Sequence, residues 1–167
     1  MRTTGLILLL FITVSSMSQD IRSFTLTGVV SDKTDQKPIE DYIVDVYQGN
    51  KIIHTVSSGK KGKFSVDVFG SSQYTIEIFK EGYYPKRAIF ITNVPEKIKK
   101  LSDLEFDAEL IRIEDYKDLE AVDIFSTSIF DFPYVIFEYD KSSEDFYYRK
   151  AYTDHIKDQY ESIADLR

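Results

Sequence analysis

The sequence contains no cysteine and has only seven glycines and four prolines. Without cysteine the chain forms no disulfide, no thiolate metal site, no cysteine nucleophile and no lipid-modified cysteine. The few glycines include no Gly-rich phosphate-binding loop. The formal net charge of −7 argues against a function that depends on neutralising phosphates. We therefore predict no nucleic-acid partner.

Motifs of catalysis and metal binding are also lacking. The two histidines, His54 and His155, belong to no H-E-x-x-H or H-x-x-E pattern, and no G-x-S-x-G sequence is present. The oxygen-rich segment 140–145 lacks the central glycine and the later glutamate of an EF-hand loop. His54 is in phase with Ile52 and Val56, which favours a partly buried core histidine. We predict that the chain is not an enzyme, with no catalytic residue, metal ligand or cofactor.

Apolar and aromatic residues are abundant in the 167-residue chain, at 43% and 14%. This content predicts a folded core, and the length suits one domain with an appendage. At the N-terminus, Arg2 precedes an apolar run over 5–14, and the small residues Ser16 and Ser18 follow. This pattern predicts a signal peptide over 1–18 with cleavage before Gln19, the alternative being an uncleaved anchor. We expect an exported protein, in the periplasm or at the cell surface or outside the cell, with no transmembrane segment after cleavage.

Apolar residues recur with a period of two between residues 24 and 113, and no helical period interrupts them before residue 115. Such alternation is typical of half-buried strands. Gly49-Asn50 between two alternating runs predicts a tight hairpin. The expected strands lie at 24–30, 42–46, 52–56, 64–68, 74–78, 89–91 and 104–110. We predict an all-β fold, a seven-stranded antiparallel sandwich.

The segment TGVVSDKTDQKPIEDYIVDVYQGNKIIHTVSSGKKGKFSVDV, with YTIEIFKEGYYPK after it, resembles the carboxypeptidase regulatory-like domain, a transthyretin-like (Ig-like) β-sandwich, as found in secreted proteins of the Bacteroidetes type. The resemblance covers residues 24–95 and differs at Glu40-Asp41, where a small residue and glycine are usual. It implies a domain that helps to fold, space or dock other domains, with no catalytic activity in the motif itself. The matching positions are Gly28, Val30, Asp32, Pro38, Ile39, Val44, Val46, Gly62, Phe64, Tyr74, Ile76, Ile78, Gly82, Tyr83 and Pro85.

Charge divides the chain into a sandwich over 19–113 and an acidic C-terminal extension over 114–167. Residues 19–100 carry a net charge of +3 and residues 101–167 a net charge of −11. Asp103, Glu105, Asp107 and Glu109 alternate with apolar residues, which indicates a solvated strand edge or, alternatively, a surface for calcium or a basic partner. In the extension we expect a strand near 134–139, a returning strand at 146–148 and a terminal helix. The helix either packs on the protein's own strands or binds a partner.

Two functions are consistent with these features. The first is a non-catalytic exported accessory or interaction module of the cell envelope, whose partner is an envelope protein or a glycan. The alternative is a carbohydrate- or peptide-binding module that uses exposed aromatic side chains of the sandwich. Tyr47, Phe79 and Tyr84 are out of phase with the core residues and are the candidate ligand contacts. Lys60, Lys61 and Lys63 form a basic loop, either solvated or in contact with anionic envelope material.

Overall fold

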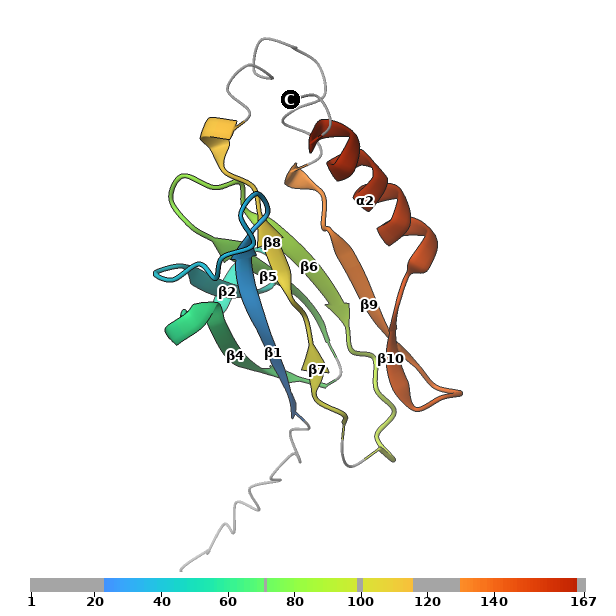
Figure 1. Ribbon diagram of the computed structural model, residues 1–167. Helices are drawn as coiled ribbons and strands as arrows, with labels where there is room; N and C mark the ends of the chain where they lie inside the picture. Colours follow the sequence, from blue (N-terminus) through green and yellow to red (C-terminus); the bar gives the residue numbers. More distant parts are fainter. Residues whose placement is uncertain (1–22, 71, 99–100, 116–129, 165–167) are drawn as a thin grey trace, which may run out of the picture.

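Alternating apolar residues build two facing β-sheets in the computed structural model, which describes residues 23–70, 72–98, 101–115 and 130–164 (Figure 1). The predicted signal peptide and residues 116–129 of the extension lie outside the described residues. One sheet has the order β4-β1-β7, with β8 also paired to β1, and the other has the order β10-β9-β6-β5-β2-β3. The strands are β1 (Ser23–Asp32), β2 (Ile43–Gln48), β3 (Lys51–Ser57), β4 (Lys63–Phe69), β5 (Gln73–Phe79), β6 (Lys86–Ile91), β7 (Leu104–Glu105), β8 (Ala108–Leu110), β9 (Val135–Asp140) and β10 (Asp145–Tyr148).

The core lies between the two sheets. On β1 the side chains of Phe24, Leu26 and Val30 are buried, whereas the polar residues between them face outward or lie partly exposed. β4 and β5 bury alternate residues in the same way, because successive side chains of a strand point to opposite faces. On β2 the apolar Val44 and Val46 are buried, and Asp45 between them is buried as well. The predicted mostly-β sandwich with a C-terminal helix is therefore confirmed.

The last predicted strand of the sandwich differs from expectation, because it is broken into β7 and β8, which both pair with β1 in parallel. At the break, carboxylates replace ladder bonds: Asp107 accepts the N–H of Val29 at 2.8 Å and Asp103 accepts that of Thr25 at 2.9 Å. Gly28 permits this close approach, since a Cβ there would lie 2.0 Å from the carbonyl oxygen of Phe106. Part of the acidic row thus completes the backbone hydrogen bonding of β1.

The C-terminal extension continues the six-stranded sheet. β9 pairs in parallel with β6, and β10 returns antiparallel to β9. Phe137 of β9 stacks on Phe90 with ring centroids 4.8 Å apart, and Phe146 of β10 lies 4.8 Å from Phe24. The sequence predicted antiparallel pairing only, because alternation does not reveal which strand lies beside which.

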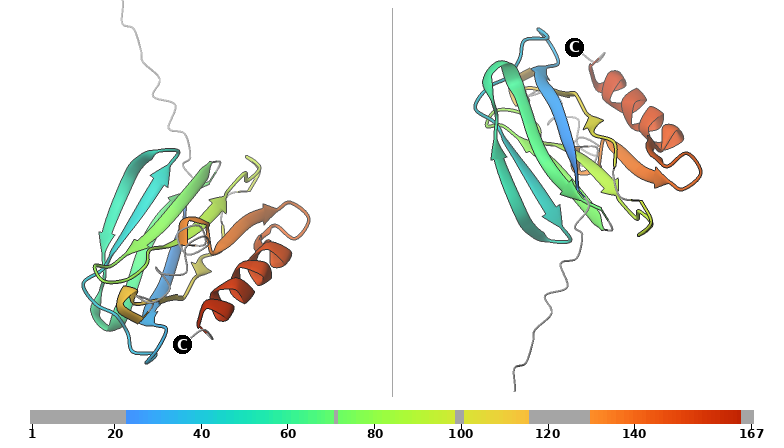
Figure 2. Two further views of the ribbon diagram at one scale, coloured as in Figure 1. Left: turned by 90° about the horizontal axis from the view of Figure 1, so that it is seen from above. Right: turned by 90° about the horizontal axis from the view of Figure 1, so that it is seen from below.

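Helix α2 (Lys150–Ala164) lies along the side of the sandwich next to β9 and β10, away from β2 and β3 (Figure 2). It buries Thr153, Ile156 and Tyr160. Tyr148, which shares the helical spacing in the sequence, belongs to β10 instead. The expected helix therefore packs on the protein's own strands. No described helix is long and apolar enough to cross a membrane.

Candidate functional site

Asp32 organises one end of the sandwich. Its side chain is 1% exposed, and one carboxylate oxygen accepts the backbone N–H groups of Thr34 and Asp35 at 2.8 and 3.2 Å. The other oxygen accepts the hydroxyl of Tyr83 at 2.9 Å and lies 2.5 Å from Nε of Arg112. Both oxygens are engaged in holding a turn and two connections together, so this cluster is structural. It gives Asp32 and Tyr83, two residues of the sequence motif, a structural task.

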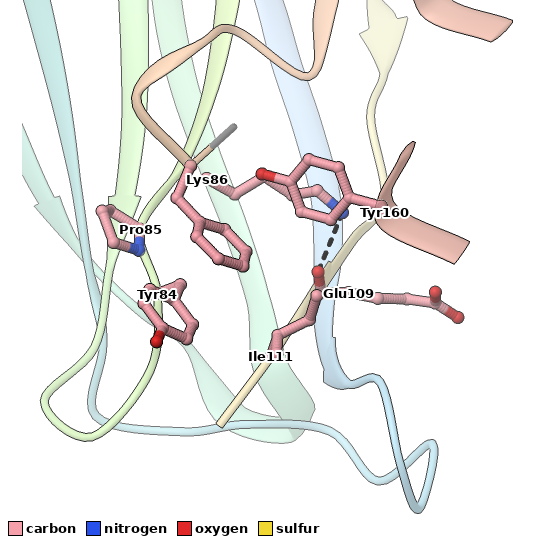
Figure 3. Close-up of a pocket in the computed structure, with 7 residues that line it drawn as sticks. Tyr84, Pro85, Lys86, Glu109, Ile111 and Tyr160 are labelled. Carbon is pink, nitrogen blue, oxygen red and sulfur yellow. Dashed lines mark hydrogen bonds between the residues drawn. The ribbon is translucent and has the colours of Figure 1, made fainter. Parts of the chain in front are cut away.

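A second cluster surrounds Lys86, a residue that the sequence analysis did not single out. Lys86 is in phase with the inward-facing Ala88 and Phe90, so its side chain enters the space between the sheets. Its Nζ donates a hydrogen bond to the carbonyl oxygen of Glu109 at 2.8 Å (Figure 3). Burial lowers the pKa of Lys86 to about 7. The sequence signal for this cluster is a lysine at a strand position that alternates with the outward-facing residues.

Aromatic rings from the extension enclose the amine. Nζ lies 3.6 Å from the centroid of the Tyr134 ring and 5.7 Å from that of Tyr160. Tyr84 stacks on Phe130 with centroids 3.9 Å apart, at the same junction. The small hollow between these residues does not admit a water molecule. Buried lysines of lowered pKa are used as nucleophiles, but here no space remains for a substrate beside Nζ.

The outer face of the six-stranded sheet carries two of the three aromatic residues proposed as ligand contacts. Tyr47 and Phe79 both point outward, because their neighbours Val46 and Ile78 point into the core. Phe79 is 44% exposed and is paired with Ile43, which is 36% exposed. The structure does not bring Tyr84 to this face, since Tyr84 lies half-buried at the extension.

A shallow hollow of about 390 Å³ lies beside Tyr47. Glu77 and Arg87 form an ion pair in it, with Nε of Arg87 as the donor, and Arg87 also donates to the carbonyl oxygen of Asp131 at 3.2 Å. Burial and the nearby Glu77 carboxylate raise the pKa of Tyr47. The lining residues are Tyr47, Gly49, Asn50, Thr75, Glu77 and Arg87.

Strand β3 forms one edge of the six-stranded sheet, and all its residues except Val56 are exposed. Ile52 and Ile53 are 47% and 40% exposed. His54 pairs with the inward-facing Val46, but a register shift in the β2–β3 pairing places Ile52 opposite Tyr47, so His54 and Ile52 do not share a phase. His54 is also exposed, so the expected partly buried histidine is wrong. The reason is its place on an edge strand, which leaves one side of the side chain uncovered.

The other charged clusters of the described residues are not arranged as ion-binding sites. Among the described residues no group of three or more His, Asp or Glu side chains is arranged to hold a metal ion. Glu109 is paired with Lys33 at 2.9 Å, and this contact lowers the pKa of the Glu109 carboxyl against the effect of burial. The basic residues Lys60 and Lys61 lie in a 3-10 turn, and the N–H of Lys61 donates to Glu40 at 2.8 Å.

Comparison with known proteins identifies no family for this chain. No family model matches the chain, and no curated protein matches its sequence. The structure is similar to a 3-chlorocatechol 1,2-dioxygenase from Rhodococcus opacus, at 11% identity and a TM-score of 0.39 over 57% of this chain and 66% of that one. It is similar to catechol 1,2-dioxygenase from Acinetobacter radioresistens, at 13% identity and a TM-score of 0.41 over 58% and 54%. It is also similar to the pilus 2b backbone protein of group B streptococcus, at 12% identity and a TM-score of 0.37 over 53% of this chain and 41% of that one.

The chain therefore spans between about two fifths and two thirds of the length of these structures. The prediction that the chain is not an enzyme is contradicted, because the solved structures that it resembles include catechol dioxygenases, which are enzymes. At such low identity and TM-score the likeness assigns no reaction to this chain.

Proposed function

We propose that this protein is an exported accessory module of the cell envelope that binds a partner polypeptide along strand β3. We further propose that it belongs with the carboxypeptidase regulatory-like, transthyretin-like sandwiches. The motif residues Gly28, Asp32 and Tyr83 support this assignment, because each has a specific structural task in the sandwich. The N-terminal pattern of a charged residue, an apolar run and small residues supports export.

The exposed edge of β3 is the observation that carries the proposal. An edge strand presents N–H and C=O groups that no neighbouring strand pairs, and a partner segment in extended conformation can bind to them. β3 adds apolar contact area through Ile52 and Ile53. Ile43 and Phe79 form a different apolar patch, which the polar row of Asp45 and Glu77 separates from the row that contains Ile52.

A hollow of about 580 Å³ adjoins the C-terminal end of β3 and offers room for a side chain of the partner segment. Val56 and Ser57 of β3 line it together with Lys63 and Phe64 of β4. Main-chain pairing supplies affinity in this recognition mode, and a neighbouring pocket supplies specificity. The partner is therefore an extended polypeptide segment with alternating apolar residues.

Site-specific photo-crosslinking in the native host tests this proposal. We would place a photoreactive phenylalanine at Ile52, and at Asp158 on the exposed side of α2 as the control. We expect one discrete protein adduct from position 52 and none from position 158. The variant Ile53→Lys, which adds a charge to the edge, should remove the adduct. Equal adducts from both positions, or none from position 52, would refute binding at β3.

A further inference from the structure

The hollow beside Tyr47 combines chemical groups that the edge of β3 lacks. Tyr47 is paired with Thr75 on β5, and the next outward row holds Asp45, Glu77 and Arg87 on three adjacent strands. An aromatic ring therefore lies diagonally next to an ion pair on a rigid sheet. The Gly49-Asn50 turn closes one end of the hollow.

The polar groups of this hollow are held in place before any ligand arrives. The side chains of Arg87 and Glu77 are 28% and 17% exposed, and Arg87 is anchored on its far side by the carbonyl oxygen of Asp131. Asp45, which is 9% exposed, accepts the hydroxyl of Thr55 at 2.5 Å, and this bond holds its carboxylate against β3. Groups fixed in this way lose little conformational freedom on binding.

The charge and hydrogen-bonding groups of the lining indicate which class of ligand the hollow can bind. Glu77 and Arg87 contribute one negative and one positive charge, and the carboxylates of Asp45 and Asp131 lie beside them, so the hollow does not favour an anionic ligand. Among the described residues no group of acidic side chains there is arranged to hold a metal ion. β2 and β5 are interior strands whose backbones already pair on both sides, so the hollow offers no ladder bonds to a peptide. Its side chains instead offer an aromatic face together with several hydrogen-bond donors and acceptors, all within one small volume.

We propose that this hollow is a binding site for a neutral saccharide. The C–H groups of one sugar ring pack on the Tyr47 ring, whose face is the negative part of its quadrupole. The hydroxyl groups of the sugar accept from Arg87 and donate to the Glu77 carboxylate, with Thr75 and Asn50 at the rim. The volume of about 390 Å³ falls in the range of about 300–1,000 Å³ that is usual for small-molecule sites. This site adjoins the partner-binding edge proposed above, because Tyr47 is paired with Ile52 of β3, but it uses side chains on the sheet face, whereas the partner segment would use the backbone edge of β3.

Saturation-transfer NMR with six neutral hexasaccharides tests the assignment on the folded protein: maltohexaose, cellohexaose, xylohexaose, laminarihexaose, mannohexaose and chitohexaose. We expect transfer to at least one of them. Titration of that saccharide should show an affinity about tenfold lower or worse for Tyr47→Ala. Tyr47→Phe, which keeps the ring, should bind within about twofold of the original chain. Phe79→Ala, a change on the same sheet face outside the hollow, is the matched control and should bind normally.

Three results would overturn the proposal: no transfer to any of the six saccharides, unchanged binding by Tyr47→Ala, or loss of binding in Phe79→Ala alone. An amide NMR spectrum of Tyr47→Ala that differs from the original only near residue 47 ensures that a loss of binding is not a loss of fold. The photo-crosslink at position 52 is measured independently, so failure of the saccharide site and failure of the β3 partner site are distinguishable.

Discussion

The Nζ atom of Lys86 lies 3.6 Å from the centroid of the Tyr134 ring, so a sandwich strand and the C-terminal extension meet at a buried amine. Lys86 belongs to β6, and Tyr134 directly precedes β9, the strand that pairs with β6. The pKa of the amine also depends on nearby charges. These are Glu109 of β8, Lys33 after β1 and Lys157 of α2. The junction therefore couples the packing of the extension to the protonation of one side chain.

Lys86 makes the stability of the protein depend on pH. Burial lowers the pKa of Lys86 to about 7 from the 10.5 of an exposed lysine. Between these values the unfolded chain binds more protons than the folded one, so stability rises with pH, by up to about 1.4 kcal/mol per pH unit. We expect Lys86→Met to remove this rise, as measured by urea unfolding at pH 7, 8 and 9. Equal slopes for the two proteins would contradict it.

Thr153 offers a way to stabilise the chain. Its side chain is 2% exposed, and its hydroxyl has no hydrogen-bond partner in the described structure. Thr153→Val keeps the shape and removes the unsatisfied hydroxyl, so the free energy of unfolding should increase by about 1 kcal/mol. Thr92 is the matched control: its hydroxyl lies 2.8 Å from the carbonyl oxygen of Ser72 and 3.0 Å from that of Phe69. Thr92→Val should instead lower stability, and thermal melts would separate the two.

Asp32 should be the most sensitive polar residue of the sandwich. Asp32→Asn removes the negative charge beside Arg112 in a site that is 1% exposed. We expect the free energy of unfolding to fall by about 2 kcal/mol, less than for a fully buried pair because Arg112 reaches solvent. Tyr83→Phe removes only one hydrogen bond to Asp32 and should cost about 1 kcal/mol. A smaller loss of stability for Asp32→Asn than for Tyr83→Phe would show that Asp32 is not the central residue of this cluster.

The extension should unfold together with the sandwich. Phe137 of β9 stacks on Phe90 and contacts Phe106 edge-on at 6.0 Å. Phe137→Ala should lower the free energy of unfolding of the whole protein by about 3 kcal/mol and keep a single transition. Phe132→Ala is the control, because that ring is 53% exposed and its loss should change stability by less than about 0.5 kcal/mol. Two separate transitions would show that the extension folds on its own.

Several features of the site region were readable from the sequence. The outward phase of Tyr47 and Phe79 follows from the alternation of apolar residues in the sequence of their strands, and the structure places both on the outer face. Tyr84 lies outside a strand, so alternation did not determine its surroundings, and the extension covers it instead. The sequence did not indicate that Lys86 is buried, because a lysine is rarely buried unless a partner satisfies its charge. That partner, a backbone carbonyl of another strand, leaves no trace in the sequence.

Local periodicity and composition are enough to predict the strands between residues 24 and 110, the terminal helix and the division of charge. They do not predict that β7 and β8 run parallel to β1, that β9 joins β6, or that Glu77, Arg87 and Tyr47 share one hollow. Those relationships join residues far apart along the chain. Strand pairing, register and side-chain proximity of that kind arise from packing over the whole molecule. A local sequence pattern contains no information about them.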